Sequence, residues 1–309
     1  MRRLLQKTAN LTGVATLVFA ALIGVLAMAA PATLLSDRVG ADSSEARPDS
    51  AHHGVVAWML GMSGRLRVVD VAPLAVLVPA LAAGGPGMHP TGLSAPDGEP
   101  IQALALVPLH DKLGANWRGY RVGYWPGERT ANRHRSRYPL PDGFLEVTPE
   151  NQDLQLTTHF RVRDFLTHDQ QDTWPKVLVI QLPLLDKLEL IRGALEGLGK
   201  PAALRVMSGF RTPQYNALGL GTRGGRARDS RHMYGDAADI FVDADGDGRM
   251  DDLDGDGRVT VKDAQWLARV AAGVDAQHPT VTGGIGIYRA NAVHGPFVHV
   301  DTRGTPARW

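Results

Sequence analysis

Two histidines and an aspartate in the last third of the chain are residue types that can hold a catalytic zinc ion. His232 and Asp239 lie in the segment Ser230–Asp239, and His299 lies in the segment Gly295–Asp301. Catalytic zinc is held by three nitrogen or oxygen ligands about 2.0–2.2 Å away, and water takes the fourth position. The chain has no cysteine, which excludes thiolate zinc sites, disulfides and thiol nucleophiles.

The spacing of the first two candidates requires the chain to turn back on itself. On one continuous helix, His232 and Asp239 would lie roughly 10 Å apart along the axis, too far for one ion. Gly235 stands between them and provides a place to turn. Asp239 is then expected to begin a strand that runs to Val242, with His299 on a second short strand. The alternative is that the two histidines are unrelated and fulfil separate structural roles.

A predicted helix and strand precede this segment. Apolar residues recur at helical spacing at Leu184, Leu185, Leu188, Ile191, Leu195 and Leu198. Pro183 is tolerated in the first turn of such a helix, and Gly199 lies just past its end. A short strand is expected at residues 204–207.

A second helix start follows at Thr212-Pro213. Threonine is a favoured N-cap, and proline has the φ angle of the first helical position. Arg211 therefore lies on a loop at the positive end of a helix, where it is placed to hold an anion. The alternative is an ordinary surface arginine.

A run of aspartates and glycines lies between Asp239 and His299. Calcium loops take oxygen ligands from positions 1, 3, 5 and 12, with glycine at position 6. One register uses Asp243, Asp245, Asp247 and Asp254, and a second uses Asp252, Asp254, Asp256 and Asp263. The second register resembles dockerin-type loops and precedes a predicted helix. Both registers need Asp254, so one or two Ca²⁺ ions are expected in an insert at residues 243–263; the alternative is a flexible acidic loop.

Three segments, in order, resemble the family of zinc D-Ala-D-Ala carboxypeptidases and the related murein endopeptidases and phage endolysins. They are Ser208–Arg211, Ser230–Asp239 and Phe297–Asp301. The resemblance covers about residues 145–309. It implies a small α+β domain, with a central antiparallel sheet and flanking helices, that carries the metal in a cleft. It also implies that His232, Asp239 and His299 are the zinc ligands and that Arg211 holds a substrate carbonyl or carboxylate.

The chain departs from this family at the position of the general base. Many relatives carry Glu or His three residues before the last ligand, and here that residue is Pro296. His294 is the first candidate to replace it and Asp301 the second. Asp301 is also a candidate to orient a zinc ligand from behind.

The N-terminus predicts export. Arg2, Arg3 and Lys7 precede an apolar run at residues 11–30, and Ala27-Met28-Ala29 fits a small-residue cleavage site. Residues 1–30 are therefore expected to be a signal peptide or an uncleaved membrane anchor, since the run is near the length that spans a bilayer. Either outcome places the protein in the periplasm or cell envelope.

Length and composition indicate two globular units. The chain has 309 residues, 44% of them hydrophobic, and a formal net charge of +1, so its charge does not favour nucleic acid as a partner. We expect a linker at residues 31–52, a small β-rich domain at residues 53–145, and the peptidase domain at residues 146–309.

These observations together predict zinc-dependent hydrolysis of peptide bonds in peptidoglycan stem peptides or cross-links, by an endopeptidase or a carboxypeptidase. Pro296 leaves open a non-catalytic peptidoglycan-binding or cell-envelope scaffolding protein that keeps the fold. The acidic loops alone favour a third possibility, a calcium-dependent adhesion module.

Overall fold

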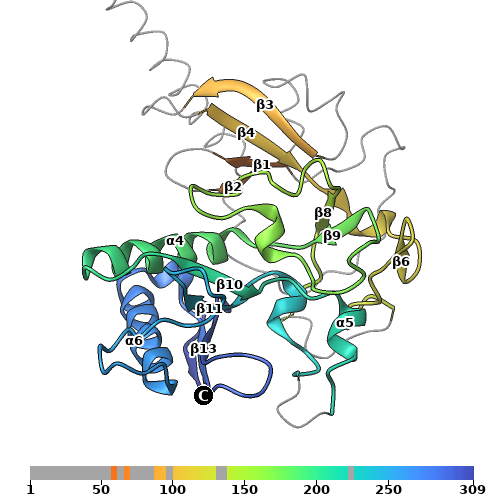
Figure 1. Ribbon diagram of the computed structural model, residues 1–309. Helices are drawn as coiled ribbons and strands as arrows, with labels where there is room; N and C mark the ends of the chain where they lie inside the picture. Colours follow the sequence, from red (N-terminus) through yellow and green to blue (C-terminus); the bar gives the residue numbers. More distant parts are fainter. Residues whose placement is uncertain (1–56, 61–65, 70–86, 95–99, 130–137, 222–225) are drawn as a thin grey trace, which may run out of the picture. The chain divides into compact units, whose positions relative to one another are not determined.

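The computed structural model describes residues 57–60, 66–69, 87–94, 100–129, 138–221 and 226–309 (Figure 1). The fold is mixed α+β with small sheets and few helices, as the sequence predicts. The expected signal or anchor segment and the linker after it lie outside the described residues. Within the described ranges, no helix is long and apolar enough to cross a membrane.

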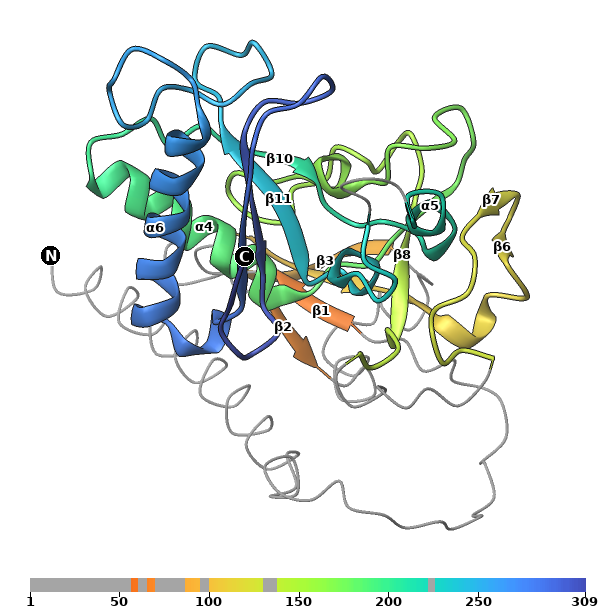
Figure 2. The same ribbon diagram turned by 90° about the horizontal axis from the view of Figure 1, so that it is seen from below.

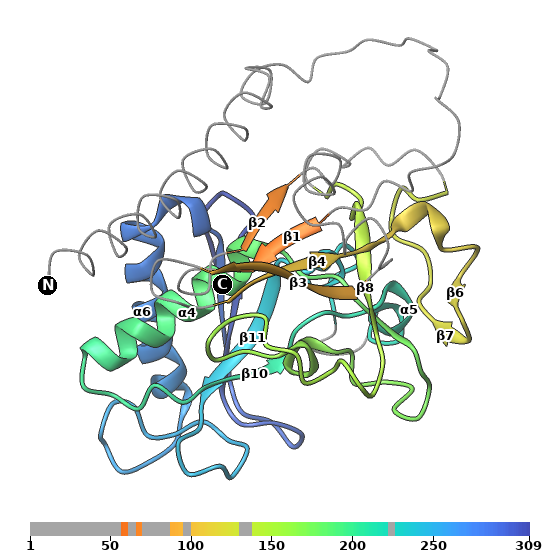
Figure 3. The ribbon, with the colours of Figure 1, turned by 90° about the horizontal axis from the view of Figure 1, so that it is seen from above.

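The first sheet lies in the segment expected to be β-rich. Its order is β2 (Leu66–Val69), β1 (Ala57–Leu60), β4 (Pro100–Ala105) and β3 (Gly87–Ser94), and every neighbouring pair is antiparallel (Figure 3). The division of the chain into the domains expected above stays a prediction.

A five-stranded sheet dominates the C-terminal half. Its order is β10 (Leu204–Ser208), β11 (Ala237–Val242), β13 (Phe297–Asp301), β12 (Gly284–Tyr288) and β14 (Ala307–Arg308). Three pairs are antiparallel, but β12 and β14 are parallel. The expected antiparallel sheet is therefore present in its central strands, with one parallel pair at this edge. The chain reverses after β13 and then lies on the far side of β12, so β14 runs in the same direction as β12.

Two helices flank this sheet. Helix α4 (Leu182–Gly197) has Pro183 in its first turn and buries the predicted leucine face, although Leu198 is 59% exposed at the C-cap. Helix α6 (Val261–Gln277) begins at a capping box, in which Thr260 and Asp263 bond each other's backbone. The two helices lie beside each other (Figure 2), and α6 also contacts β12 and β13.

The segment before residue 145 contributes to the same hydrophobic core. A small sheet joins β5 (Val107–Pro108) to β8 (Gly143–Val147) and β8 to β9 (Lys176–Leu178). Trp125 is buried, and its Nε1 donates to the Met233 carbonyl at 2.6 Å. These contacts cross the boundary expected between residues 145 and 146. The bond from Trp125 also fixes the backbone at Met233, next to His232.

Candidate metal centre

Asp239 and His299 are direct neighbours across the central strands. They form a Cα pair between the antiparallel strands β11 and β13, so both side chains project from the same face of the sheet. His299 Nδ1 lies 3.0 Å from Asp239 Oδ1. The strand pairing alone thus brings together two of the three predicted ligands.

His232 reaches the same point from the short 3₁₀ helix η4 (Arg231–Tyr234). The chain leaves this helix through Gly235, which has a left-handed backbone with φ +71°. A Cβ at Gly235 would lie 2.4 Å from the Val179 carbonyl oxygen, so only glycine fits. The chain turns back between His232 and Asp239 where the sequence predicts it.

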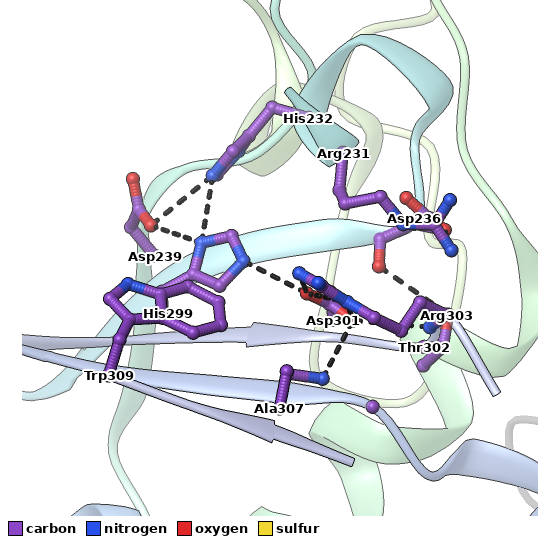
Figure 4. Close-up of polar contacts among 12 residues, drawn as sticks. Arg231, His232, Asp236, Asp239, His299, Asp301, Thr302, Arg303, Ala307 and Trp309 are labelled. Carbon is purple, nitrogen blue, oxygen red and sulfur yellow. Dashed lines mark hydrogen bonds and ion pairs between the residues drawn. The ribbon is translucent and has the colours of Figure 1, made fainter. Parts of the chain in front are cut away.

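The three candidate ligand atoms converge (Figure 4). His232 Nε2 lies 3.1 Å from His299 Nδ1 and 3.3 Å from Asp239 Oδ1. Three ligands of a tetrahedral ion, each about 2.1 Å from the metal, would be spaced by about 3.4 Å. All three side chains are buried, and their types and spacing fit a zinc ion with one open position.

Each histidine is oriented by a hydrogen bond at the ring nitrogen that points away from the ligand cluster. His232 Nδ1 donates to the Gly209 carbonyl at 2.7 Å, and His299 Nε2 lies 3.3 Å from Asp301 Oδ2. With a proton on each of these outer nitrogens, the other ring nitrogen directs a lone pair at the centre. Such partners fix the tautomer and the ring orientation of metal-binding histidines.

Asp301 is fully buried behind His299, away from the centre. The Gly284 amide donates to it at 2.8 Å and Arg303 Nε at 2.9 Å. Burial alone would raise the pKa of Asp301, but hydrogen bonds from His299, Arg303 and Gly284 hold that pKa well below its usual range. Of the two roles predicted for Asp301, this position corresponds to the orienting one.

Arg211 lies at the ligand cluster. Its Nη2 donates to Asp239 Oδ2, the carboxylate oxygen that faces away from the histidines, and its Nε donates to Ser208 Oγ at 2.9 Å. The following residue caps helix α5 (Pro213–Ala217) as predicted, because the Thr212 hydroxyl accepts from the Tyr215 amide at 3.1 Å.

His294 lies in the wall of the same cavity. Its Nδ1 donates to the Gly295 carbonyl at 2.8 Å, and its Nε2 accepts from Asn291 Nδ2 at 2.8 Å. The ring packs edge-on against Phe297, with 4.9 Å between centroids. To act as a base, His294 Nε2 would have to lose its hydrogen bond from Asn291 and accept a proton from the reacting group instead.

The cavity over the ligand cluster has a volume of ≈570 Å³, and its lining includes two residues that sequence reasoning missed, His168 and Trp309. Burial, together with the charges of Arg211 and Lys176, lowers the pKa of His168. The Trp309 ring lies 5.2 Å from the His299 ring. Neither residue belongs to a recognisable motif; Trp309 reaches the site only because β14 pairs with β12.

Residues 158–252 match the family model described as Peptidase M15. This match supports a zinc-dependent metallopeptidase. No curated protein and no solved structure matches the chain. The Peptidase M15 match includes Arg211, His232 and Asp239, whereas His299 lies beyond its end and joins them through strand pairing.

The acidic segment lies across the end of the Peptidase M15 match, at Asp252. The structure gathers two groups of carboxylates, one of Asp243, Asp245 and Asp251 and one of Asp252, Asp254 and Asp263. Within each group the oxygens lie within 4.8 Å of one another. Asp251, which neither predicted register used, completes the first group, so the two groups do not compete for Asp254.

The remaining two predicted calcium ligands, Asp247 and Asp256, lie outside both groups. Asp247 accepts from the Arg249 amide at 2.8 Å, and Asp256 pairs with Lys262 Nζ at 2.8 Å. Their carboxylates therefore stabilise the turns in which they lie.

Proposed function

We propose that this protein hydrolyses peptide bonds in peptidoglycan stem peptides or cross-links, as a zinc-dependent endopeptidase or carboxypeptidase. The observation that carries the proposal is the convergence of His232 Nε2, Asp239 Oδ1 and His299 Nδ1 within 3.3 Å at the floor of a cavity. Two oriented imidazoles and a carboxylate form the ligand set of a hydrolytic zinc centre.

When bound, zinc lowers the pKa of water towards neutrality and polarises a carbonyl group. The guanidinium of Arg211 lies beside the centre and would stabilise negative charge on the substrate carbonyl or carboxylate. The fixed hydrogen bonds of the two histidines keep this geometry in place without reorganisation.

In this proposal His294 takes the proton from the attacking water and hands it to the leaving amine. His294 lines the cavity, and hydrogen bonding to the Gly295 carbonyl keeps the proton on Nδ1, so Nε2 is the basic nitrogen. His168 is the second candidate, because it lines the same cavity and burial lowers its pKa, which favours the neutral imidazole that a general base needs.

The competing function is a peptidoglycan-binding or cell-envelope scaffolding protein that does not cleave its ligand. The observation that favours it is the hydrogen bond from Asn291 Nδ2, which occupies the basic nitrogen of His294. The two functions differ in whether a peptide product appears.

The proposal includes export to the periplasm or cell envelope, with cleavage of residues 1–30 or anchoring by them. It also includes structural Ca²⁺ at the two carboxylate groups at residues 243–263. Support for Ca²⁺ comes from the shared geometry, since Gly246, Gly248, Gly255 and Gly257 all have φ of +78° to +80° and each group offers three carboxylates. Metal analysis of the folded protein after dialysis against Ca²⁺-free buffer tests this part; a calcium content of zero would contradict it.

The direct test of the function is incubation of purified, zinc-loaded protein with peptidoglycan, followed by separation of the released muropeptides. We expect a new peptide product that disappears with a chelator and with the His232→Ala variant. Binding of peptidoglycan without any zinc-dependent product would support the competing function instead.

A further inference from the structure

Among the residues that the structure describes, four arginines line the cavity over the ligand cluster, and one of these four differs from the others in its ion pairing. Arg211 is paired with Asp239, Arg231 with Asp236, and Arg303 with Asp301. Arg226 has no carboxylate within 4 Å among the residues that the structure describes. Residues 222–225, which precede Arg226, include no Asp or Glu.

The side chain of Arg226 is nevertheless held in place. Its guanidinium lies over the Tyr215 ring, 4.0 Å from the centroid, and Nη1 donates to the Tyr215 carbonyl. Its aliphatic stem lies against Gly219, where a Cβ would approach Arg226 Cδ to 2.7 Å. An arginine that is stacked and bonded in this way loses little rotamer entropy when it binds a ligand.

The guanidinium carries five N–H donors, and only one of them is bonded within the described part of the protein. The other four have no hydrogen-bond partner among the described residues, and Arg226 lines the cavity. A planar fork of donors matches a carboxylate, and the charge makes such hydrogen bonds about twice as strong as neutral ones.

We propose that Arg226, positioned by Tyr215, forms a second carboxylate subsite in this cavity. Arg226 would bind a substrate carboxylate that lies away from the peptide bond being cut. Arg211 would act separately, at the ligand cluster. This inference rests on the proposed function, because peptidoglycan stem peptides carry free carboxylates on residues other than the last. Arg226 would thereby distinguish peptides with free carboxyl groups from peptides in which these groups are amidated.

The test uses two synthetic stem pentapeptides that differ only in whether their internal carboxyl groups are free or amidated. The C-terminal carboxylate stays free in both. Equilibrium binding to the zinc-loaded full chain is measured by calorimetry for wild type, Arg226→Gln and Arg226→Lys. Arg228→Gln is the matched control, because Arg228 is an exposed arginine of the same loop that does not line the cavity. Thermal unfolding of each variant checks that the fold is retained.

We expect wild type to bind the free acid about tenfold more tightly than the amide, the effect of one charge-assisted contact. Arg226→Gln should abolish this preference, Arg226→Lys should retain part of it, and Arg228→Gln should leave it unchanged. Equal affinities in wild type, a preference that survives in Arg226→Gln, or binding of neither peptide would overturn the subsite. Selective binding without hydrolysis would overturn the proposed function and leave the subsite standing.

Discussion

Asp239 uses its two carboxylate oxygens for different partners, and this division links it to His299 on one side and to Arg211 on the other. Its Oδ1 lies 3.0 Å from His299 Nδ1, and its Oδ2 accepts from Arg211 Nη2. Burial alone would raise the pKa of Asp239, but His232, His299 and Arg211 lower it well below the usual value. The carboxylate is therefore ionised, as a metal ligand must be.

Replacing this carboxylate tests the metal centre. Asp239→Asn keeps the shape of the side chain but removes the negative charge between two histidines and an arginine. Loss of a residue that hydrogen-bonds to a metal ligand typically weakens metal binding about 10–100-fold. Loss of a ligand itself should therefore weaken zinc binding by more than about 100-fold. Competition with a fluorescent chelator measures this change. Asp229→Asn, which alters another aspartate of the same cavity, should leave zinc affinity nearly unchanged.

Asp301 should make the stability of the metal-free protein depend on pH. Its pKa is lower in the folded protein than in the unfolded chain, where an aspartate titrates near about 3.9. A lowered folded pKa adds stability that is present above the unfolded pKa and is lost as the pH falls below it.

The measurement is urea unfolding between about pH 2.5 and pH 7 with a chelator present. We expect the free energy of unfolding to fall more steeply below about pH 4 in wild type than in Asp301→Asn. Parallel curves for the two proteins would show that Asp301 gains no stabilising interaction on folding.

Gly235 offers a test of the turn that brings His232 to the strands. Gly235→Ala imposes a positive φ on an L-residue and sets its Cβ 2.4 Å from the Val179 carbonyl oxygen. Left-handed strain alone costs about 1–3 kcal/mol, and the clash adds to this cost. Gly246→Ala is the matched control, since Gly246 has φ +78° but nothing within 4 Å of a Cβ. Thermal unfolding should show a clearly larger loss for Gly235→Ala, and zinc affinity should fall only in that variant.

This turn also illustrates which parts of the site are predictable from sequence. A helix cap, a helical leucine face or a glycine between two ligands acts over a few residues, so α4, the start of α5 and the turn at Gly235 all follow from local patterns. The pairing of Asp239 with His299 lay beyond such patterns, because the two residues are 60 positions apart; the family resemblance supplied it.

Other features depended on tertiary contacts that no local pattern specifies. Trp309 lies beside His299 because β14 joins the far edge of β12 in parallel. Asp251 completes a carboxylate group because the backbone returns to β11, where the Asp251 amide donates to the Val242 carbonyl. Neither arrangement is encoded by the spacing of the residues concerned.

Two histidines of the same cavity, His294 and His168, are candidates for the proton-transfer group, and replacing each in turn distinguishes them. If His294 is the base, His294→Ala should lower kcat about 10²–10⁴-fold on a stem peptide, with zinc content unchanged. The acid limb of the pH–rate profile should disappear with it, because that limb reports deprotonation of the base.

His168→Gln should then lower kcat less than about tenfold, since a cavity-wall residue that takes no part in proton transfer contributes only a binding contact. Burial and the charge of Arg211 lower the pKa of His168, so an acid limb set by His168 would lie below the ordinary histidine range. A profile that loses its limb in His168→Gln and keeps it in His294→Ala would assign the proton transfer to His168. In that case the bond from Asn291 to His294 Nε2 would serve only to fix the cavity wall.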